Sequence, residues 1–126
     1  MSKETRILAV DDEPIIGELL RCGLEAPHRT VMLAADGREA LGMAAKQKFD
    51  LVITDHRMPQ VGGLEFVRKL RRRKFGGKII VLSGYLGPDK VGMYEGLGID
   101  KLVSKPCDMA ELRVIVDGLE QSAFEG

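Results

Sequence analysis

Five short apolar runs recur along the chain, with longer amphipathic segments between them. Three of the runs are continuously apolar rather than alternating, which is typical of strands covered by helices on both faces. The alternation of strand patterns with helix patterns predicts β-α units that form a parallel sheet, and therefore an α/β fold. The runs are Ile7–Val10, Thr30–Ala34, Leu51–Thr54, Lys78–Leu82 and Leu102–Val103.

The segments between the runs carry helix signals. Pro14 suits the first position of a helix, and Ile16, Leu19, Leu20 and Gly23 follow at the spacing of one helix face. Two later segments begin with an N-cap residue and a Glu three positions on, which is the capping-box pattern. These are Asp36 to Glu39 and Asp108 to Glu111. The apolar face is predicted to contain Leu64, Val67 and Leu70 in the third helix, and Leu112, Ile115, Val116 and Leu119 in the last.

The fourth helix, between Pro88 and Leu97, has the weakest pattern. It contains Gly92 and Gly96, each of which costs about 1 kcal/mol relative to Ala in a helix. We therefore expect this helix to be short, mobile or rearranged.

The chain has 126 residues, which suits one compact domain. We expect a single domain over residues 1–126, with a core from about residue 5 to residue 122. Lys plus Arg and Asp plus Glu number 19 each, so no overall field favours nucleic acid or an anionic membrane. Cys22 and Cys107 lack the spacing of a disulfide framework or a zinc site. No signal peptide or membrane span is apparent, which predicts a cytoplasmic protein.

Polar residues follow four of the apolar runs. Asp11-Asp12-Glu13 follow the first run, Asp55 ends the third, Ser83 follows the fourth, and Lys105 comes soon after the fifth. Ligands of doubly wound sheets bind beyond the carboxyl ends of the strands, so these side chains are expected to converge. Clustered carboxylates raise one another's proton affinity unless a cation offsets the repulsion, so this cluster requires a metal ion, Lys105 or both. Mg²⁺ is the natural candidate, because it prefers carboxylates together with phosphate oxygens. Mn²⁺ suits the same oxygen ligands.

This constellation resembles the receiver domain of bacterial response regulators, including the chemotaxis regulators. The matching motifs are Asp11-Asp12-Glu13-Pro14, Asp55-His-Arg-Met-Pro59, Gly63, Ser83-Gly84 and Lys105-Pro106, and the match runs from about Ile7 to Leu119. The resemblance implies a flavodoxin-like, doubly wound sheet of five parallel strands in the order 2-1-3-4-5, with five helices on its two faces. It also implies a role in a two-component, His-to-Asp phosphorelay.

Carried over to this sequence, the resemblance makes Asp55 the phosphoacceptor. Asp12, Asp55 and the backbone carbonyl of Arg57 would bind Mg²⁺ or Mn²⁺, and Asp11 would act directly or through a metal-bound water. Lys105 and the Ser83 hydroxyl would contact phosphoryl oxygens, and Gly84 would leave space for them. Arg57 and Tyr85 would influence how fast the acyl phosphate hydrolyses.

The sequence also departs from the family pattern. Leu102 stands where many receivers have a Tyr or Phe that turns inward on phosphorylation, so an aromatic switch cannot operate there. Cys107 replaces a common Phe, and Gly62 replaces a common acidic residue. These departures leave the predicted phosphorylation chemistry unchanged and predict an atypical output mechanism.

The resemblance implies a signalling switch that catalyses only its own phosphorylation and dephosphorylation. Its donor would be a sensor histidine kinase or a phosphotransfer protein, and its output a downstream protein or a parent output module. The expected output face comprises the fourth helix, the fifth strand and the last helix, and a homodimer could form through that face. A vestigial receiver that binds proteins without phosphorylation is the alternative. An enzyme of similar fold, either a phosphatase-like hydrolase or a flavin protein, is a third hypothesis.

Other polar features have simpler interpretations. Asp11 and Asp12 alone would also suit the positive end of a helix dipole. The basic stretch Arg68–Lys74 lies at a predicted helix C-terminus without interleaved aromatics, which favours a solvated helix end over a nucleic-acid site. His28 and His56 lack a ligand-spaced partner and are assigned to the surface or to loops.

Overall fold

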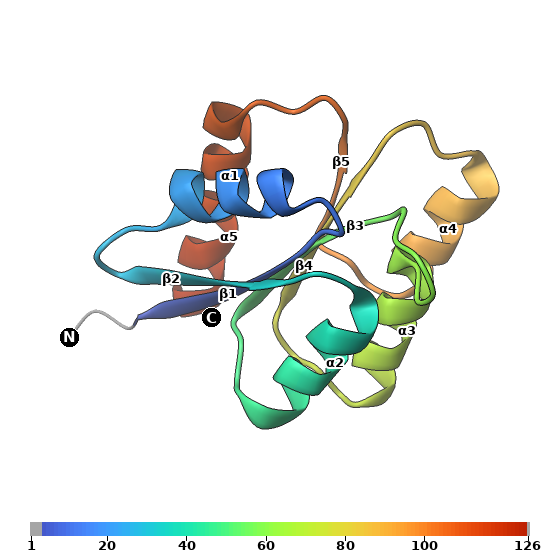
Figure 1. Cartoon of the computed structure of the whole chain (residues 1–126), viewed down its shortest axis with the longest axis horizontal. Helices are drawn as coiled ribbons and strands as arrows, with labels where there is room; N and C mark the ends of the chain where they lie inside the picture. The colour runs from blue at the N-terminus through green and yellow to red at the C-terminus, as the bar shows by residue number, and fades with distance from the viewer. Residues whose placement is uncertain (1–3, 126) are drawn as a thin grey trace.

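The structure is a computed structural model that describes residues 4–125, with side chains described as far as residue 121. Five strands and five helices alternate along the chain (Figure 1). The strands are β1 (Thr5–Val10), β2 (Arg29–Ala34), β3 (Leu51–Asp55), β4 (Lys78–Ser83) and β5 (Lys101–Ser104). The helices are α1 (Pro14–Leu24), α2 (Gly37–Lys46), α3 (Gly63–Arg72), α4 (Pro88–Gly96) and α5 (Met109–Glu125).

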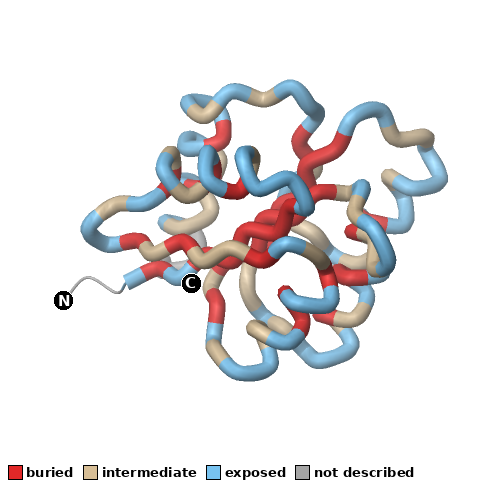
Figure 2. The backbone as a smooth tube through the Cα atoms, viewed as in Figure 1, coloured by how far each residue is buried: buried red, intermediate tan, exposed pale blue. Residues whose placement is uncertain are grey.

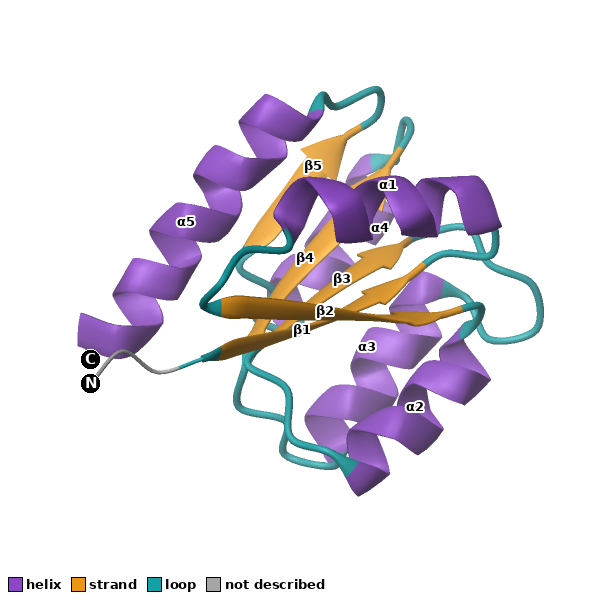
Figure 3. Cartoon of the chain, turned by 60° about the vertical axis from the view of Figure 1, so that its left-hand side comes forward, coloured by secondary structure: helices purple, strands orange, loops and turns teal. Residues whose placement is uncertain are grey.

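The strands form one sheet in the order β2-β1-β3-β4-β5, and every neighbouring pair is parallel. Helices α1 and α5 cover one face, and α2, α3 and α4 cover the other (Figure 3). The predicted α/β fold, strand order and two-faced arrangement are therefore confirmed. All parallel strands have their carboxyl ends at the same edge of the sheet, so the polar residues that follow them meet there.

Consecutive strand residues point into two different cores, because successive side chains of a strand alternate between its faces. Ile7 and Ala9 of β1 pack with α1 and α5, whereas Leu8 and Val10 pack with α2, α3 and α4. Figure 2 shows the buried residues concentrated along the central strands. This double burial explains why the strands appear in the sequence as continuous apolar runs.

The helix starts follow the predicted signals, with one difference in which face is buried. Asp36 accepts a hydrogen bond from the amide of Glu39 at 2.8 Å, and the Glu39 carboxylate accepts from the amide of Ala35. Helix α1 begins at Pro14 as predicted, but Leu19 is 53% exposed. The buried face of α1 is Gly17, Leu20 and Leu24.

Basic residues near the end of α3 take part in the fold. The Arg71 guanidinium donates to the carbonyls of Leu97, Phe75 and Gly98 at 2.7 to 2.8 Å. Arg73 donates to the carbonyl of Leu41. Arg73 is exposed, as a solvated helix end predicts, whereas Arg71 is half-buried. The hydrogen bonds of these two arginines to backbone carbonyls are a feature that the prediction did not include.

Within residues 4–125, no helix combines the length and the apolar character needed to cross a bilayer.

Candidate functional site

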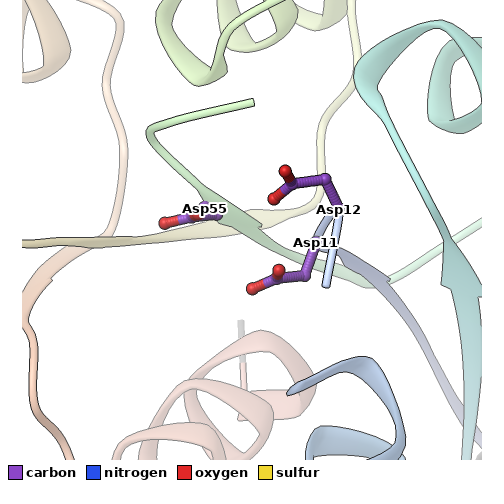
Figure 4. Close-up of side chains that lie close together, drawn as sticks. All are labelled: Asp11, Asp12 and Asp55. Carbon is purple, nitrogen blue, oxygen red and sulfur yellow. The ribbon is translucent and has the colours of Figure 1, made fainter. Parts of the chain in front are cut away.

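Three carboxylates gather at the carboxyl edge of the sheet. Asp11 and Asp12 follow β1 and Asp55 ends β3, and one oxygen from each lies within 4.8 Å of the others (Figure 4). The register explains the cluster, because Val10 of β1 is paired with Thr54 of the adjacent β3. The next residue after each member of this pair is an aspartate, so Asp11 and Asp55 become neighbours although they are distant in sequence.

Asp11 is buried and only partly hydrogen-bonded. It is 5% exposed, and its Oδ1 accepts a hydrogen bond from the amide of Glu13. Within the described residues its buried Oδ2 has no hydrogen-bond partner. Burial raises the pKa of Asp11, and the carboxylates of Asp55 and Asp12 raise it further. An oxygen-binding cation beside this cluster would satisfy the orphaned oxygen and offset the repulsion.

Lys105 supplies a positive charge to the same cluster. Its Nζ lies 2.9 Å from Oδ1 of Asp55, although Lys105 directly follows β5 and β4 separates that strand from β3. The backbone places the lysine, because the amide of Lys105 donates to the carbonyl of Ser83 at 2.7 Å. Burial would lower the pKa of Lys105, but its hydrogen bond to Asp55 and the charges of Asp55, Asp11 and Glu13 raise it overall. The ammonium therefore remains charged at neutral pH.

The remaining predicted residues line one cleft of about 630 Å³ above Asp55. Ser83 is buried at the end of β4, whereas Tyr85 is 91% exposed. A methyl group built on Gly84 would meet nothing within 4 Å, so this position leaves the cleft open. The cleft is lined by Asp12, Glu13, Asp55, His56, Arg57, Ser83, Gly84, Tyr85, Leu86, Gly87, Lys90 and Lys105.

Leu102 lies away from this cleft. It is half-buried on β5 and packs against the core beneath α2, α3 and α4. The side chain thus packs against the core, but it offers no hydroxyl and less area than a Tyr or Phe at this position.

His56 and Tyr94 form a contact that the sequence did not predict. Nδ1 of His56 lies 2.5 Å from Oη of Tyr94, and the rings meet edge to face with centroids 5.5 Å apart. Burial raises the pKa of the Tyr94 phenol and lowers that of His56, and the cations of Lys90 and Arg57 lower the histidine further. Both groups are thus neutral at pH 7, and the phenol can donate to the imidazole. His56 lies in the loop after β3, as predicted, and its contact with Tyr94 is what the sequence did not indicate.

Two sequence features could have indicated this contact. Tyr94 is the one aromatic residue between Gly92 and Gly96, in the segment with the weakest helix pattern. His56 directly follows the predicted phosphoacceptor. Neither feature identifies the partner, because 38 positions separate the two residues in sequence.

Comparisons with known proteins agree with this geometry. The family model of the response regulator receiver domain matches residues 7–117. The alkaline phosphatase synthesis transcriptional regulatory protein PhoP of Bacillus subtilis is 36% identical over 115 residues, which cover 90% of this chain and 48% of that protein. The CAI-1 autoinducer sensor kinase/phosphatase CqsS of Vibrio cholerae is 37% identical over 108 residues, covering 83% of this chain and 16% of that protein. The chain thus spans about half or less of the length of these relatives.

Solved structures agree as well. The chemotaxis response regulator CheY4 of Vibrio cholerae superposes with a TM-score of 0.85 at 31% identity, over 93% of this chain and 99% of that one. A CheY-like receiver domain protein from Methanospirillum hungatei gives a TM-score of 0.88 at 28% identity, over 98% of this chain and 100% of that one. The acidic cluster, the lysine beside it and these matches lead to one conclusion: the chain belongs to the response regulator receiver domains of two-component systems.

Proposed function

We propose that the chain is a phospho-accepting receiver domain in which Asp55 takes a phosphoryl group from a phosphohistidine or a small acyl phosphate. The observation that carries this proposal is the ion pair between Lys105 and Asp55 inside a cluster of three carboxylates. Such an arrangement suits the transfer of a charged group to a carboxylate. The proposal treats residues 1–126 as one receiver unit.

In the proposed transfer, a carboxylate oxygen of Asp55 attacks the phosphorus atom. A new oxygen–phosphorus bond forms, and the bond between phosphorus and the donor breaks, with its electron pair leaving on the imidazole nitrogen or the carboxylate of the donor. In the subsequent hydrolysis, water attacks phosphorus, the bond to Asp55 breaks with its electron pair on the carboxylate, and inorganic phosphate is released. The chain would thus catalyse only its own phosphorylation and dephosphorylation.

The other site residues have distinct proposed roles. Lys105 already lies beside an Asp55 oxygen, so its ammonium would contact a phosphoryl oxygen as a point charge. The buried hydroxyl of Ser83 would donate to a second phosphoryl oxygen. Gly84 would leave room for the group, and Arg57 and Tyr85 at the cleft mouth would affect the access of water.

The donor set fits Mg²⁺ or Mn²⁺. Asp12, Asp55 and the backbone carbonyl of Arg57 would hold the ion, and Asp11 would bind it directly or through a water. Support comes from the spacing of the carboxylate oxygens and from the unpartnered Oδ2 of Asp11. When bound, the ion would neutralise charge on the phosphoryl oxygens during transfer.

The proposed partners follow from this chemistry. A sensor histidine kinase or a phosphotransfer protein would supply the phosphoryl group, and a downstream protein or an attached output module would read the result. The face formed by α4, β5 and α5 is the proposed readout surface and could also pair two copies of the chain.

Intact-mass measurement after incubation with acetyl phosphate and Mg²⁺ tests the proposal. The wild type is expected to gain one phosphoryl group, and Asp55→Asn is expected to gain none. If neither acetyl phosphate nor a histidine phosphodonor labels the wild type, the alternative of a phosphorylation-independent binding module is favoured instead. Leu102 is the residue that keeps this alternative under consideration, because it removes the usual aromatic switch.

A further inference from the structure

Helix α4 depends on other elements for its position. It contains Gly92 and Gly96, begins after Gly87, and has no Lys, Arg or His in its last turn. Its sequence therefore supplies little helix propensity, no side-chain N-cap and no cation for the dipole. Among its nine residues, all of which the structure describes, Tyr94 alone is buried. The attachment of α4 to the domain thus rests largely on this side chain and on groups from neighbouring elements.

The Tyr94 hydroxyl connects α4 to the residue beside the phosphoacceptor. It shares a hydrogen bond with Nδ1 of His56 at 2.5 Å. The amide of His56 lies 3.0 Å from Oδ1 of Asp55 and also donates to the carbonyl of Leu82. One residue therefore contacts the Asp55 carboxylate through its backbone and α4 through its ring.

Gly63 closes the packing around this connection. Its amide donates to the carbonyl of His56 at 2.9 Å. A methyl group built on Gly63 would lie 2.6 Å from the Asp55 carbonyl oxygen, 2.8 Å from Cα of His56 and 2.9 Å from Oη of Tyr94. Tightly packed groups transmit displacement because no space is left to absorb it. A shift at Asp55 or His56 would therefore reach Tyr94.

The C-terminal end of α4 is held separately. Arg71 of α3 donates to the carbonyls of Leu97 and Gly98 directly after the helix. This contact supplies the positive charge that the last turn of α4 lacks. The helix thus has one anchor from α3 at its C-terminal end and a second anchor, Tyr94, that leads to Asp55 through His56.

We propose that Tyr94, through its hydrogen bond to His56, transmits the phosphorylation state of Asp55 to α4. The inference rests on the proposed function and identifies its regulatory route. Tyr94 is a positioning residue, because it acts through His56. A phosphoryl group on Asp55 changes the charge and the acceptors that face the His56 amide, and the His56 ring carries that change to Tyr94. This route needs no aromatic residue at Leu102.

Hydrogen exchange of the α4 amides tests the inference, with beryllium fluoride and Mg²⁺ as a stable analogue of the phosphoryl group. In the wild type, the analogue is expected to change exchange within α4 by about fivefold or more. Tyr94→Phe keeps the ring and removes only the hydroxyl. In this variant the change is expected to fall below about twofold. Labelling of its Asp55 by acetyl phosphate should continue.

Three further variants separate coupling from loss of stability. His56→Phe removes the same hydrogen bond from the other side, and the double variant with Tyr94→Phe should behave like either single one. Glu120→Gln weakens an ion pair with Arg29 and should lower stability while keeping the α4 response. Two results would overturn this inference but not the proposed function. One is an α4 response of wild-type size in Tyr94→Phe and His56→Phe proteins that acetyl phosphate still labels. The other is no α4 response in a wild type that acetyl phosphate labels. Failure to label the wild type would overturn the proposed function with it.

Discussion

The ammonium of Lys105 lies 2.9 Å from Oδ1 of Asp55, although Lys105 directly follows β5 and Asp55 ends β3, two strands that do not neighbour each other in the sheet. Their approach results from the parallel topology, which brings the ends of β3 and β5 to one edge on either side of β4. Lys105 consequently offsets part of the negative charge that Asp11, Asp12 and Asp55 place there.

Replacing Lys105 with Met is predicted to have opposite effects on metal binding and on phosphorylation. Loss of a nearby cation should tighten Mg²⁺ binding by about 1 kcal/mol, or roughly fivefold. The same loss should slow labelling by acetyl phosphate about tenfold or more, because a charge that faces the transferred group is missing. Calorimetric titration and a mass time course measure the two effects. Lys101→Met, at the exposed start of β5, should change neither by more than about twofold. Unchanged labelling of Lys105→Met would contradict the role of this lysine.

Replacing Asp11 with Asn is predicted to stabilise the metal-free protein. The carboxylate is buried, its pKa is raised by burial and by neighbouring acids, and one of its oxygens has no hydrogen-bond partner among the described residues. Removal of the charge should increase the free energy of unfolding by about 1 kcal/mol. Thermal unfolding in EDTA measures this gain. Thermal unfolding in Mg²⁺ measures the stabilisation by Mg²⁺, which the variant is expected to lose. The control is Asp12→Asn, which replaces an exposed acid and should weaken Mg²⁺ binding without raising the free energy of unfolding in EDTA. An Asp11→Asn protein less stable than the wild type in EDTA would refute the prediction.

Two adjacent glycines are predicted to differ sharply in their tolerance of a methyl group. Gly63→Ala should lower the free energy of unfolding by about 2 to 4 kcal/mol, because its Cβ would lie 2.6 Å from a backbone oxygen. Gly62→Ala should cost less than about 1 kcal/mol, because the nearest atom to its Cβ is 3.7 Å away. Urea unfolding compares the pair. Equal stabilities would show that the packing between Gly63, His56 and Tyr94 is looser than described.

The pair between Glu120 and Arg29 is predicted to make stability depend on acid pH. Burial would raise the pKa of Glu120, but hydrogen bonds and charge from Arg29 lower it below its ordinary value of 4.5. A depressed carboxyl pKa stabilises the fold above pH 4.5, and this contribution is lost as the pH falls through the folded-state pKa. Glu120→Gln should therefore cost about 1 to 3 kcal/mol at pH 7 and progressively less toward pH 3. Urea unfolding across this range measures it, and a cost that grows on acidification would have the wrong sign.

Much of the fold could be predicted from the sequence, because its determinants are local. Strands buried on both faces appear as continuous apolar runs, and Pro14 and Asp36 mark helix starts. The positions of Asp11, Asp55, Ser83 and Lys105 could also be anticipated, since parallel strands bring their carboxyl ends to one edge. The roles of these residues, of the metal and of the partners remain predictions.

Contacts between helices could not be predicted in the same way. Arg71 looked like one of several solvated cations, but its guanidinium binds three backbone carbonyls that only the folded chain brings together. No sequence pattern linked His56 to Tyr94 as partners, because their contact depends on how α4 lies over the sheet. Leu19 fitted the spacing of the buried face of α1 and is nevertheless exposed, because the helix presents Gly17, Leu20 and Leu24 to the sheet instead.

The most direct measurement of the central claim is the chemical identity of the phosphorylated residue. Borohydride reduces an aspartyl phosphate to homoserine, which peptide mass spectrometry locates. After incubation with acetyl phosphate and Mg²⁺, the account predicts homoserine at position 55 in the wild type, and no homoserine there in Asp55→Asn or without a phosphodonor. Homoserine at Asp11 or Asp12 in place of Asp55, or a label that resists borohydride, would contradict it.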